Sequence, residues 1–214
     1  MRIDRELVFA AVADERRQMA TLLDDLNDTQ LSTPSLCAGW DIKTVGAHLL
    51  SVCTDSFWTF QGMALRRGSL DRAIDELARR RAQLPATRIA AALRCHADRR
   101  VSPPVFGPLD PLADILVHGG DIRIPLGMAF NPDRERAALA LDFLTKPWRF
   151  GFVPIGFLCG IRLCAIDIDR SWGTGAEIRG PVAALMMTVC GRSALLHQLE
   201  GPGLQPLHDR LARR

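Results

Sequence analysis

Amphipathic helical periodicity, broken at intervals by proline and glycine, constrains the first two thirds of this chain most strongly. From Asp4 to Leu26, apolar residues recur every three or four positions with charged residues between them, which is typical of a helix with one buried face. Pro85 separates two later helical stretches, because a helix interior does not tolerate proline. The further helices are predicted over Ile42 to about Phe60, Leu70–Leu84, Thr87–Arg99, Asp110 to about Leu126, and 131 to about Leu144. Such a run of helices predicts an antiparallel helical bundle.

Short polar residues and prolines mark where several of these helices should begin. Asp41 is expected to cap the helix that starts at Ile42. Asp110-Pro111 predicts another N-cap with proline in the first helical position, and Asn131-Pro132 repeats that signal. Gly127 is expected to end the helix that Asp110 opens.

The residues beyond Pro147 differ in character, because aromatic, β-branched and glycine residues gather there. We therefore expect a domain boundary near this residue, between a helical domain over 1–147 and a smaller domain over 148–214. The second domain is predicted to hold a strand, a hairpin turn, a returning strand, a helix and two short helical segments, over Ile161–Ile168, Ser171–Gly175, Ala176–Arg179, Pro181–Cys190, Leu195–Leu199 and Leu204–Leu211. The whole chain is thus expected to be α+β, a helical bundle followed by a small α+β domain.

Composition and charge exclude several classes of protein. The 27 basic and 24 acidic residues leave a formal charge of +3, and the basic residues are scattered, so we expect no nucleic-acid partner and no membrane partner. The most apolar stretch, Phe150–Ile161, is only 12 residues long, too short to span a bilayer. The charged start, Met1–Glu6, is unlike a signal peptide, and the six cysteines form no CxxC pair. A cytoplasmic protein with free thiols is therefore expected.

Candidate metal-ligating residues lie on two of the predicted helices. His48 shares a stripe with valines three residues before it and four after it, which directs it toward the interior. A core histidine bonded to a backbone carbonyl is the alternative. On the later helix, Asp114 and His118 are four residues apart and Asp121 follows three later, so all three project from one side. A surface ion pair between Asp114 and His118 is an alternative interpretation of that spacing.

His48, Asp114 and His118 are predicted to bind one divalent cation. Three inward ligands from two helices leave a fourth position for water or substrate, which is the layout of a catalytic metal site. Mixed nitrogen and oxygen ligands suit zinc best, with nickel, manganese and iron as alternatives. Asp121 is predicted to orient a histidine by accepting its second N–H, and an exposed aspartate on the helix surface is the alternative.

Three segments carry a resemblance to a known family. The run Pro34–Leu49, with its Gly39-Trp40 and His48-Leu49 pairs, resembles the signature of the DinB-like superfamily, in particular the mycothiol-dependent maleylpyruvate isomerase family. The helix over Asp114–Gly127 is similar to that family's pattern of acid, histidine and aspartate, and Gly173–Arg192 is similar to its C-terminal domain. Together the segments cover both predicted domains in the order of the family.

This resemblance implies a DinB-like antiparallel four-helix bundle whose metal, usually zinc, is held by His48, Asp114 and His118. It also implies mycothiol as thiol cosubstrate and an actinobacterial source, which fits a chain in which 25 of the 27 basic residues are arginine. Arg192 is expected to be catalytic, by similarity to a functional arginine of the isomerases, with a surface arginine as the alternative. Asp114 departs from the pattern, because the isomerases generally have glutamate there, one methylene longer.

Two classes of function follow from these observations. The first is a metal-dependent, mycothiol-using enzyme that acts on a small molecule, either a maleylpyruvate-type isomerase or a related thiol S-transferase. In the isomerase, a thiolate adds to a cis double bond, the resulting single bond rotates, and elimination releases the trans isomer. The second class is a non-catalytic DinB-like binding or stress-response protein with a vestigial metal site. A homodimer is compatible with either class.

Overall fold

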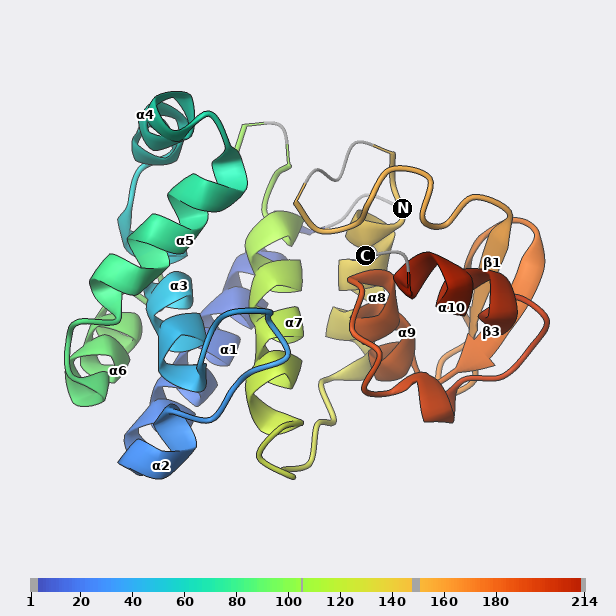
Figure 1. Ribbon diagram of the computed structural model, residues 1–214, viewed down its shortest axis with the longest axis horizontal. Coiled ribbons are helices and arrows are strands. Elements are labelled where there is room, and N and C mark those ends of the chain that lie inside the picture. The colour runs from blue at the N-terminus through green and yellow to red at the C-terminus, as the bar shows by residue number, and fades with distance from the viewer. Residues whose placement is uncertain (1–3, 105, 148–150, 213–214) are drawn as a thin grey trace. The chain divides into compact units, whose positions relative to one another are not determined.

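The computed structural model describes residues 4–104, 106–147 and 151–212. It confirms the expected α+β class, with a helix-rich first part and a three-stranded sheet in the second part (Figure 1). The chain divides into two compact units, Met1–Ala129 and Phe130–Arg214. The sequence predicts this division near residue 147, whereas the structure has it between Ala129 and Phe130. The helix over 134–144 therefore lies in the second unit and not, as expected, in the first. Within the described ranges, no helix combines the length and the apolar surface that crossing a lipid bilayer requires.

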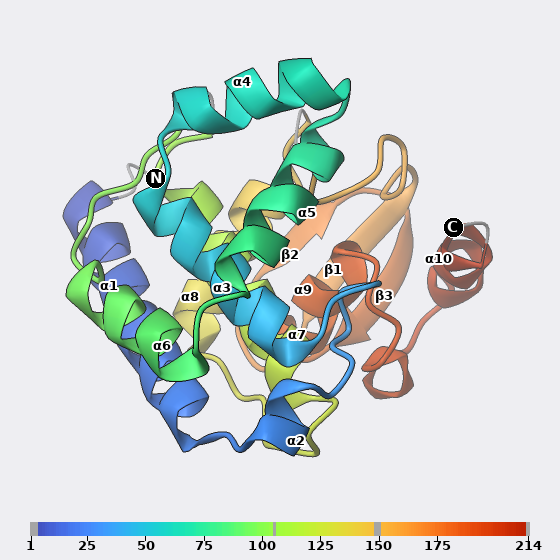
Figure 2. The same ribbon diagram turned by 60° about the vertical axis from the view of Figure 1, so that its left-hand side comes forward.

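The first unit is built from helices. Four of them form the expected bundle, because α1 and α3 each pack against both α6 and α7. Outside the bundle, α5 packs against α3, and α4 packs against α5; Figure 2 shows α4 lying across the end of α5. The helices of this unit are α1 (Arg5–Asp25), α2 (Asp28–Leu31), α3 (Ile42–Thr54), α4 (Phe57–Arg67), α5 (Leu70–Arg81), α6 (Ala86–Cys95) and α7 (Leu109–Arg123).

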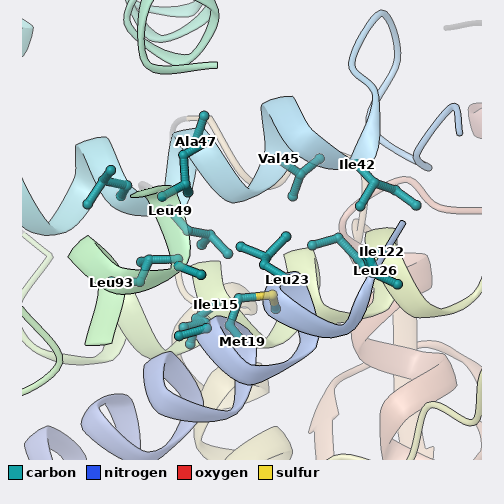
Figure 3. Packing of buried hydrophobic residues seen from close by; sticks show 14 of the residues in the cluster. Met19, Leu23, Leu26, Ile42, Val45, Ala47, Leu49, Leu93, Ile115 and Ile122 are labelled. Atoms are coloured by element: carbon teal, nitrogen blue, oxygen red, sulfur yellow. The ribbon is translucent and has the colours of Figure 1, made fainter. Parts of the chain in front are cut away.

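Aliphatic side chains from all four bundle helices form the core of the first unit. Burying each large side chain contributes roughly 1.5–3 kcal/mol to folding. Gly46 of α3 permits this packing, because a Cβ there would lie 2.7 Å from Cδ1 of Leu23. The side chains drawn in Figure 3 point toward one another from α1, α3, α6 and α7, and they include Met19, Leu23, Ile42, Val45, Leu49, Leu93, Ile115 and Ile122.

The start of α3 follows the predicted cap, whereas its end does not. The Asp41 carboxylate accepts a backbone N–H and caps α3, as expected. The helix ends at Thr54 instead of continuing to about Phe60, because Asp55 is extended and Ser56 caps the separate helix α4. A new helix therefore begins where the sequence predicts a continuous one.

The predicted caps Asp110 and Asn131 are wrong. Helix α7 begins at Leu109, which puts Asp110 and Pro111 inside its first turn. Proline is tolerated there, because the first N–H groups of a helix have no intrahelical partner to lose. In the next helix the cap is Asp133, two residues after the expected one.

The second unit combines helices with a small sheet. Strand β1 lies at its centre, antiparallel to β2 and parallel to β3. Helix α8 packs against α9, and Trp172 Nε1 on β2 donates to Asp142 Oδ1 on α8 at 2.7 Å. These contacts explain why α8 belongs with this unit. The elements are α8 (Arg134–Leu144), β1 (Ile161–Ala165), β2 (Ser171–Gly173), β3 (Ala176–Gly180), α9 (Val182–Val189), the 3₁₀ helix η1 (Leu196–Gln198) and α10 (Leu204–Leu211).

The hairpin turn predicted over Ser171–Gly175 is wrong. Its first three residues form β2, and the chain then passes to the other side of β1 to form β3. A Cβ on Gly175 would meet the backbone of Gly160 at its carbonyl oxygen, 2.1 Å away, and the φ of Gly175 is +128°. Glycine is therefore required where these segments meet, because any side chain would strike the backbone.

Candidate metal centre

The predicted ligands His48, Asp114 and His118 converge inside the first unit. His48 lies on α3 and the other two lie one turn apart on α7, the helix against which α3 packs. One ligand atom from each residue lies within 4.8 Å of the other two. The three residues are only 5%, 7% and 8% exposed, respectively. This burial differs from that of a surface ion pair, the alternative interpretation of Asp114 and His118.

The separations within this cluster suit a metal ion. His48 Nε2 lies 3.3 Å from Asp114 Oδ1, and His118 Nε2 lies 3.5 Å from the same oxygen. Two tetrahedral ligands that each lie about 2.0–2.1 Å from zinc are about 3.3–3.4 Å apart. Both Asp114 distances are close to that separation, and all three ligand atoms lie within 4.8 Å of one another. The donor set of two imidazoles and one carboxylate, buried between two helices, therefore fits the divalent cation that the family resemblance implies.

Asp121 supports His118 from the side away from the cluster. Its Oδ2 lies 2.8 Å from His118 Nδ1, and the residue is fully buried. An Nδ1–H that donates to this carboxylate leaves Nε2 as the atom directed toward Asp114. The structure thus brings Asp121 to the position expected of a residue that orients a histidine, and its burial is not that of an exposed aspartate.

Two ionisable groups of the cluster have strongly shifted pKa values. Burial acts to lower the pKa of His118, but the Asp114 charge and the hydrogen bonds to Asp114 and Asp121 outweigh burial and raise this pKa to about 9. Burial acts to raise the pKa of Asp114, yet the charges of His48 and His118 hold it well below its usual range. Without a cation, the cluster therefore pairs a protonated His118 with an ionised Asp114, and a divalent cation would have to displace that proton.

His48 and His118 are held in different ways. Among the described residues, no hydrogen-bond partner lies near His48 Nδ1, although this atom is buried. Its ring instead packs against Trp40, with the ring centroids 5.2 Å apart. The Trp40 Nε1 donates to Asp75 Oδ1 at 2.7 Å. On the side away from Asp114, the His48 ring is therefore supported by packing, whereas the His118 ring is supported by the Asp121 carboxylate.

Sequence reasoning missed Arg16, a buried cation close to this cluster. Arg16 lies on α1, is 3% exposed, and its Nη1 donates to the backbone oxygens of Ala97 and Arg99. Burial lowers its pKa, while the nearby Cys53 and Asp114 act to raise it. A signal was present in the sequence, because Arg16 stands at helical spacing within a stripe of apolar residues on α1.

Arg192, the expected catalytic arginine, lies just after α9 in the second unit. Its Nη1 donates to the backbone oxygen of Cys190 at 2.7 Å. The catalytic role of Arg192 stays a prediction.

Comparison with known families identifies the first unit. The sequence profile described as the mycothiol maleylpyruvate isomerase N-terminal domain matches residues 12–123, just over half of the chain. The chain belongs to this family. The matched region runs from α1 to the end of α7, so the mycothiol maleylpyruvate isomerase domain contains His48, Asp114 and His118. The resemblance found in the sequence is confirmed.

Solved structures extend the likeness to the whole chain. The crystal structure of the mycothiol-dependent maleylpyruvate isomerase matches with a TM-score of 0.61 at 12% identity, covering 94% of both chains. A histidine-to-alanine mutant of the mycothiol-dependent maleylpyruvate isomerase matches with a TM-score of 0.57, at the same identity and coverage. Identity this low establishes the shared fold alone. No functionally curated protein matches the sequence.

Proposed function

We propose that this chain is a metal-dependent enzyme that uses mycothiol, either for cis–trans isomerisation of a maleylpyruvate-type substrate or for a related thiol S-transfer. The observation that carries the proposal is the buried convergence of His48, Asp114 and His118 in a domain of the mycothiol maleylpyruvate isomerase family. Burying a carboxylate between two imidazoles is unfavourable unless protons or a cation compensate its charge. In the metal-free protein the proton on His118 supplies this compensation, and a divalent cation would take its place.

His48, Asp114 and His118 would hold the divalent cation. Zinc suits two nitrogens and one oxygen, with nickel, manganese and iron as alternatives. When bound, such a cation supplies Lewis acidity, which lowers the pKa of a thiol and polarises a substrate carbonyl. Asp121 keeps His118 in the tautomer that presents Nε2, and the burial of the cluster limits access of bulk water.

The isomerisation needs no net redox change. The thiolate sulfur of mycothiol forms a bond to one carbon of the cis double bond, the electron pair of that double bond passes to the conjugated substrate carbonyl, and the remaining carbon–carbon single bond rotates. Elimination then breaks the carbon–sulfur bond and restores the double bond in the trans geometry, so the thiolate is regenerated. In the S-transfer, a leaving group departs from the substrate and the new carbon–sulfur bond remains. Arg192 is proposed to bind a substrate carboxylate in either reaction, since a guanidinium pairs with a carboxylate through two hydrogen bonds.

The proposed partners are two small molecules, the substrate and the thiol. A formal charge of +3 spread over the chain offers no strong attraction for nucleic acid. We place the enzyme in the cytoplasm, where low-molecular-weight thiols stay reduced.

Metal content and thiol-dependent turnover test this proposal together. The purified protein is expected to contain about one divalent ion per chain, and His48→Ala should lose that ion. His197→Ala, which changes an exposed histidine, should keep it. Turnover of maleylpyruvate that requires mycothiol would select the isomerase, and thiol conjugation without isomerisation would select the transferase. If wild-type protein and His48→Ala bind equally little metal, the cluster is vestigial and the non-catalytic class is correct.

A further inference from the structure

One indole packs against both histidines of the metal centre. The Trp40 ring centroid lies 5.2 Å from that of His48 and 6.3 Å from that of His118, and the two imidazole centroids lie 4.9 Å apart. Aromatic rings interact favourably at centroid separations of about 4.5–7 Å. Trp40 stands just before α3, with Asp41 as the intervening cap. A displacement of this indole would therefore change the packing of both imidazole rings.

The indole is held from α5, a helix outside the four-helix bundle. Trp40 Nε1 donates to Asp75 Oδ1 at 2.7 Å. The Nε of Arg79, one turn along α5, donates to both Asp75 oxygens at 2.8 and 3.0 Å. Arg79 Nη2 also donates to the carbonyl oxygen of Gly39 at 2.9 Å. Asp75 and Arg79 thus hold both the Trp40 side chain and the backbone directly before it.

The charge state of Asp75 supports this arrangement. Burial acts to raise the pKa of Asp75, but the hydrogen bonds from Trp40 and Arg79 and the Arg79 charge outweigh burial and lower this pKa. Hydrogen bonds to an ionised carboxylate are stronger than those between neutral groups. The link from α5 to the indole is therefore a charge-assisted one.

We infer that Asp75 is a positioning residue for the metal centre and acts through the indole of Trp40. His118 is oriented by its hydrogen bond to Asp121. His48 has no such partner at Nδ1 among the described residues, so the indole packed against its ring is the group that orients it. The inference rests on the proposed function, because it requires that the cluster binds a divalent cation.

Binding of Co²⁺ to the metal-free protein tests the inference, since its visible absorption bands report the geometry of the ligands. Asp75→Ala is expected to weaken Co²⁺ binding about tenfold, at the lower end of what loss of an orienting partner produces, and to change the visible spectrum. Trp40→Phe keeps an aromatic ring but loses the N–H, so it should weaken binding to a similar degree. The double variant should bind no worse than either single variant, because both changes break the same connection.

Glu76→Ala is the matched control. Glu76 is the next residue on α5 and pairs with Arg67 and Arg80, so its removal breaks exposed ion pairs of the same helix without touching the indole. This variant should keep the wild-type affinity and spectrum. If Asp75→Ala does not fold, Asp75→Asn replaces it, and it should weaken binding to a smaller extent because a neutral amide oxygen accepts weaker hydrogen bonds from Trp40 and Arg79 than a carboxylate does.

The outcomes separate this inference from the proposed function. Wild-type Co²⁺ affinity and spectrum in the folded Asp75 variant would overturn the positioning role and leave the metal centre standing. An equal change in Glu76→Ala would also overturn it, since the effect would then come from the stability of α5. If wild-type protein binds no Co²⁺ in a saturable manner, the proposed function fails and the inference fails with it.

Discussion

Replacing Asp121 by asparagine removes the charge beside His118 while leaving an oxygen in its place. The Asp121 carboxylate is fully buried and accepts from His118 Nδ1 at 2.8 Å. Asparagine has nearly the same shape and its amide oxygen can still accept this N–H. The substitution therefore changes the strength of the hydrogen bond and the local charge more than the position of the ring.

The size of the effect follows from two opposing contributions. Loss of a carboxylate that orients a ligating histidine reduces metal affinity about 10–100-fold, or about 1.4–2.7 kcal/mol. The Asp121 charge also helps to raise the pKa of His118 to about 9, so at pH 7 a proton competes with the metal for this histidine. Removing the charge weakens that competition. The loss of affinity should consequently be smaller at pH 7 than above pH 9, where His118 is already neutral.

Competition with a chromogenic chelator at both pH values measures this difference. Asp98→Asn, which alters an aspartate side chain that is 79% exposed, serves as the control and should change the affinity less than about twofold. Thermal unfolding with and without metal gives a second measure, because stabilisation by a ligand depends on its dissociation constant. Unchanged affinity of a folded Asp121→Asn protein at both pH values would refute the role assigned to this carboxylate.

Two further predictions concern the stability of the fold. In the metal-free protein, the raised pKa of His118 contributes stability that is fully present below about pH 6.5 and is lost as pH rises through about 9, whereas the lowered pKa of Asp114 contributes stability that is lost in acid. Urea midpoints of metal-free protein should therefore fall between pH 6.5 and 9, and a rise would contradict the assigned charges. Gly175→Ala should lower the free energy of unfolding by about 3 kcal/mol or more, because its Cβ meets the Gly160 oxygen. Gly68→Ala, at φ +68° with open space around it, should lower the free energy of unfolding by only about 1–2 kcal/mol. Equal losses in the two variants would show that the contact between Gly175 and the Gly160 backbone does not require glycine.

Local sequence patterns are sufficient to place the metal-centre residues on their helices. The helical period fixes which side of a helix a residue faces, so the stripe that contains His48 and the four-residue spacing of Asp114 and His118 are informative on their own. The same patterns cannot decide which helices face one another. His48 and Asp114 are separated by 66 positions in the chain, and only the packing of α3 against α7 brings them together.

Contacts that depend on tertiary packing are beyond the reach of these patterns. Trp40 and Asp75 are 35 positions apart and meet only because α5 packs on α3. The composition of a strand does not reveal whether its neighbour runs parallel or antiparallel, which is why the hairpin turn predicted around Gly175 is wrong. Arg16 is missed for a different reason. Its spacing places it among buried residues, but arginine is seldom buried, so its residue type predicts a solvent-exposed position.

The aspartate at position 114 is shorter than the glutamate of the family pattern but still lies close to both histidines. The resemblance leads one to expect glutamate, and a shorter arm would weaken a metal centre if its oxygen fell short of the histidines. In the structure Asp114 Oδ1 lies 3.3 Å from His48 Nε2 and 3.5 Å from His118 Nε2, close to the separation of about 3.3–3.4 Å that tetrahedral ligands of zinc require. The packing of α7 against α3 brings this aspartate oxygen within hydrogen-bond distance of His48. The shorter side chain of Asp114 therefore does not by itself keep the carboxylate away from the two imidazoles.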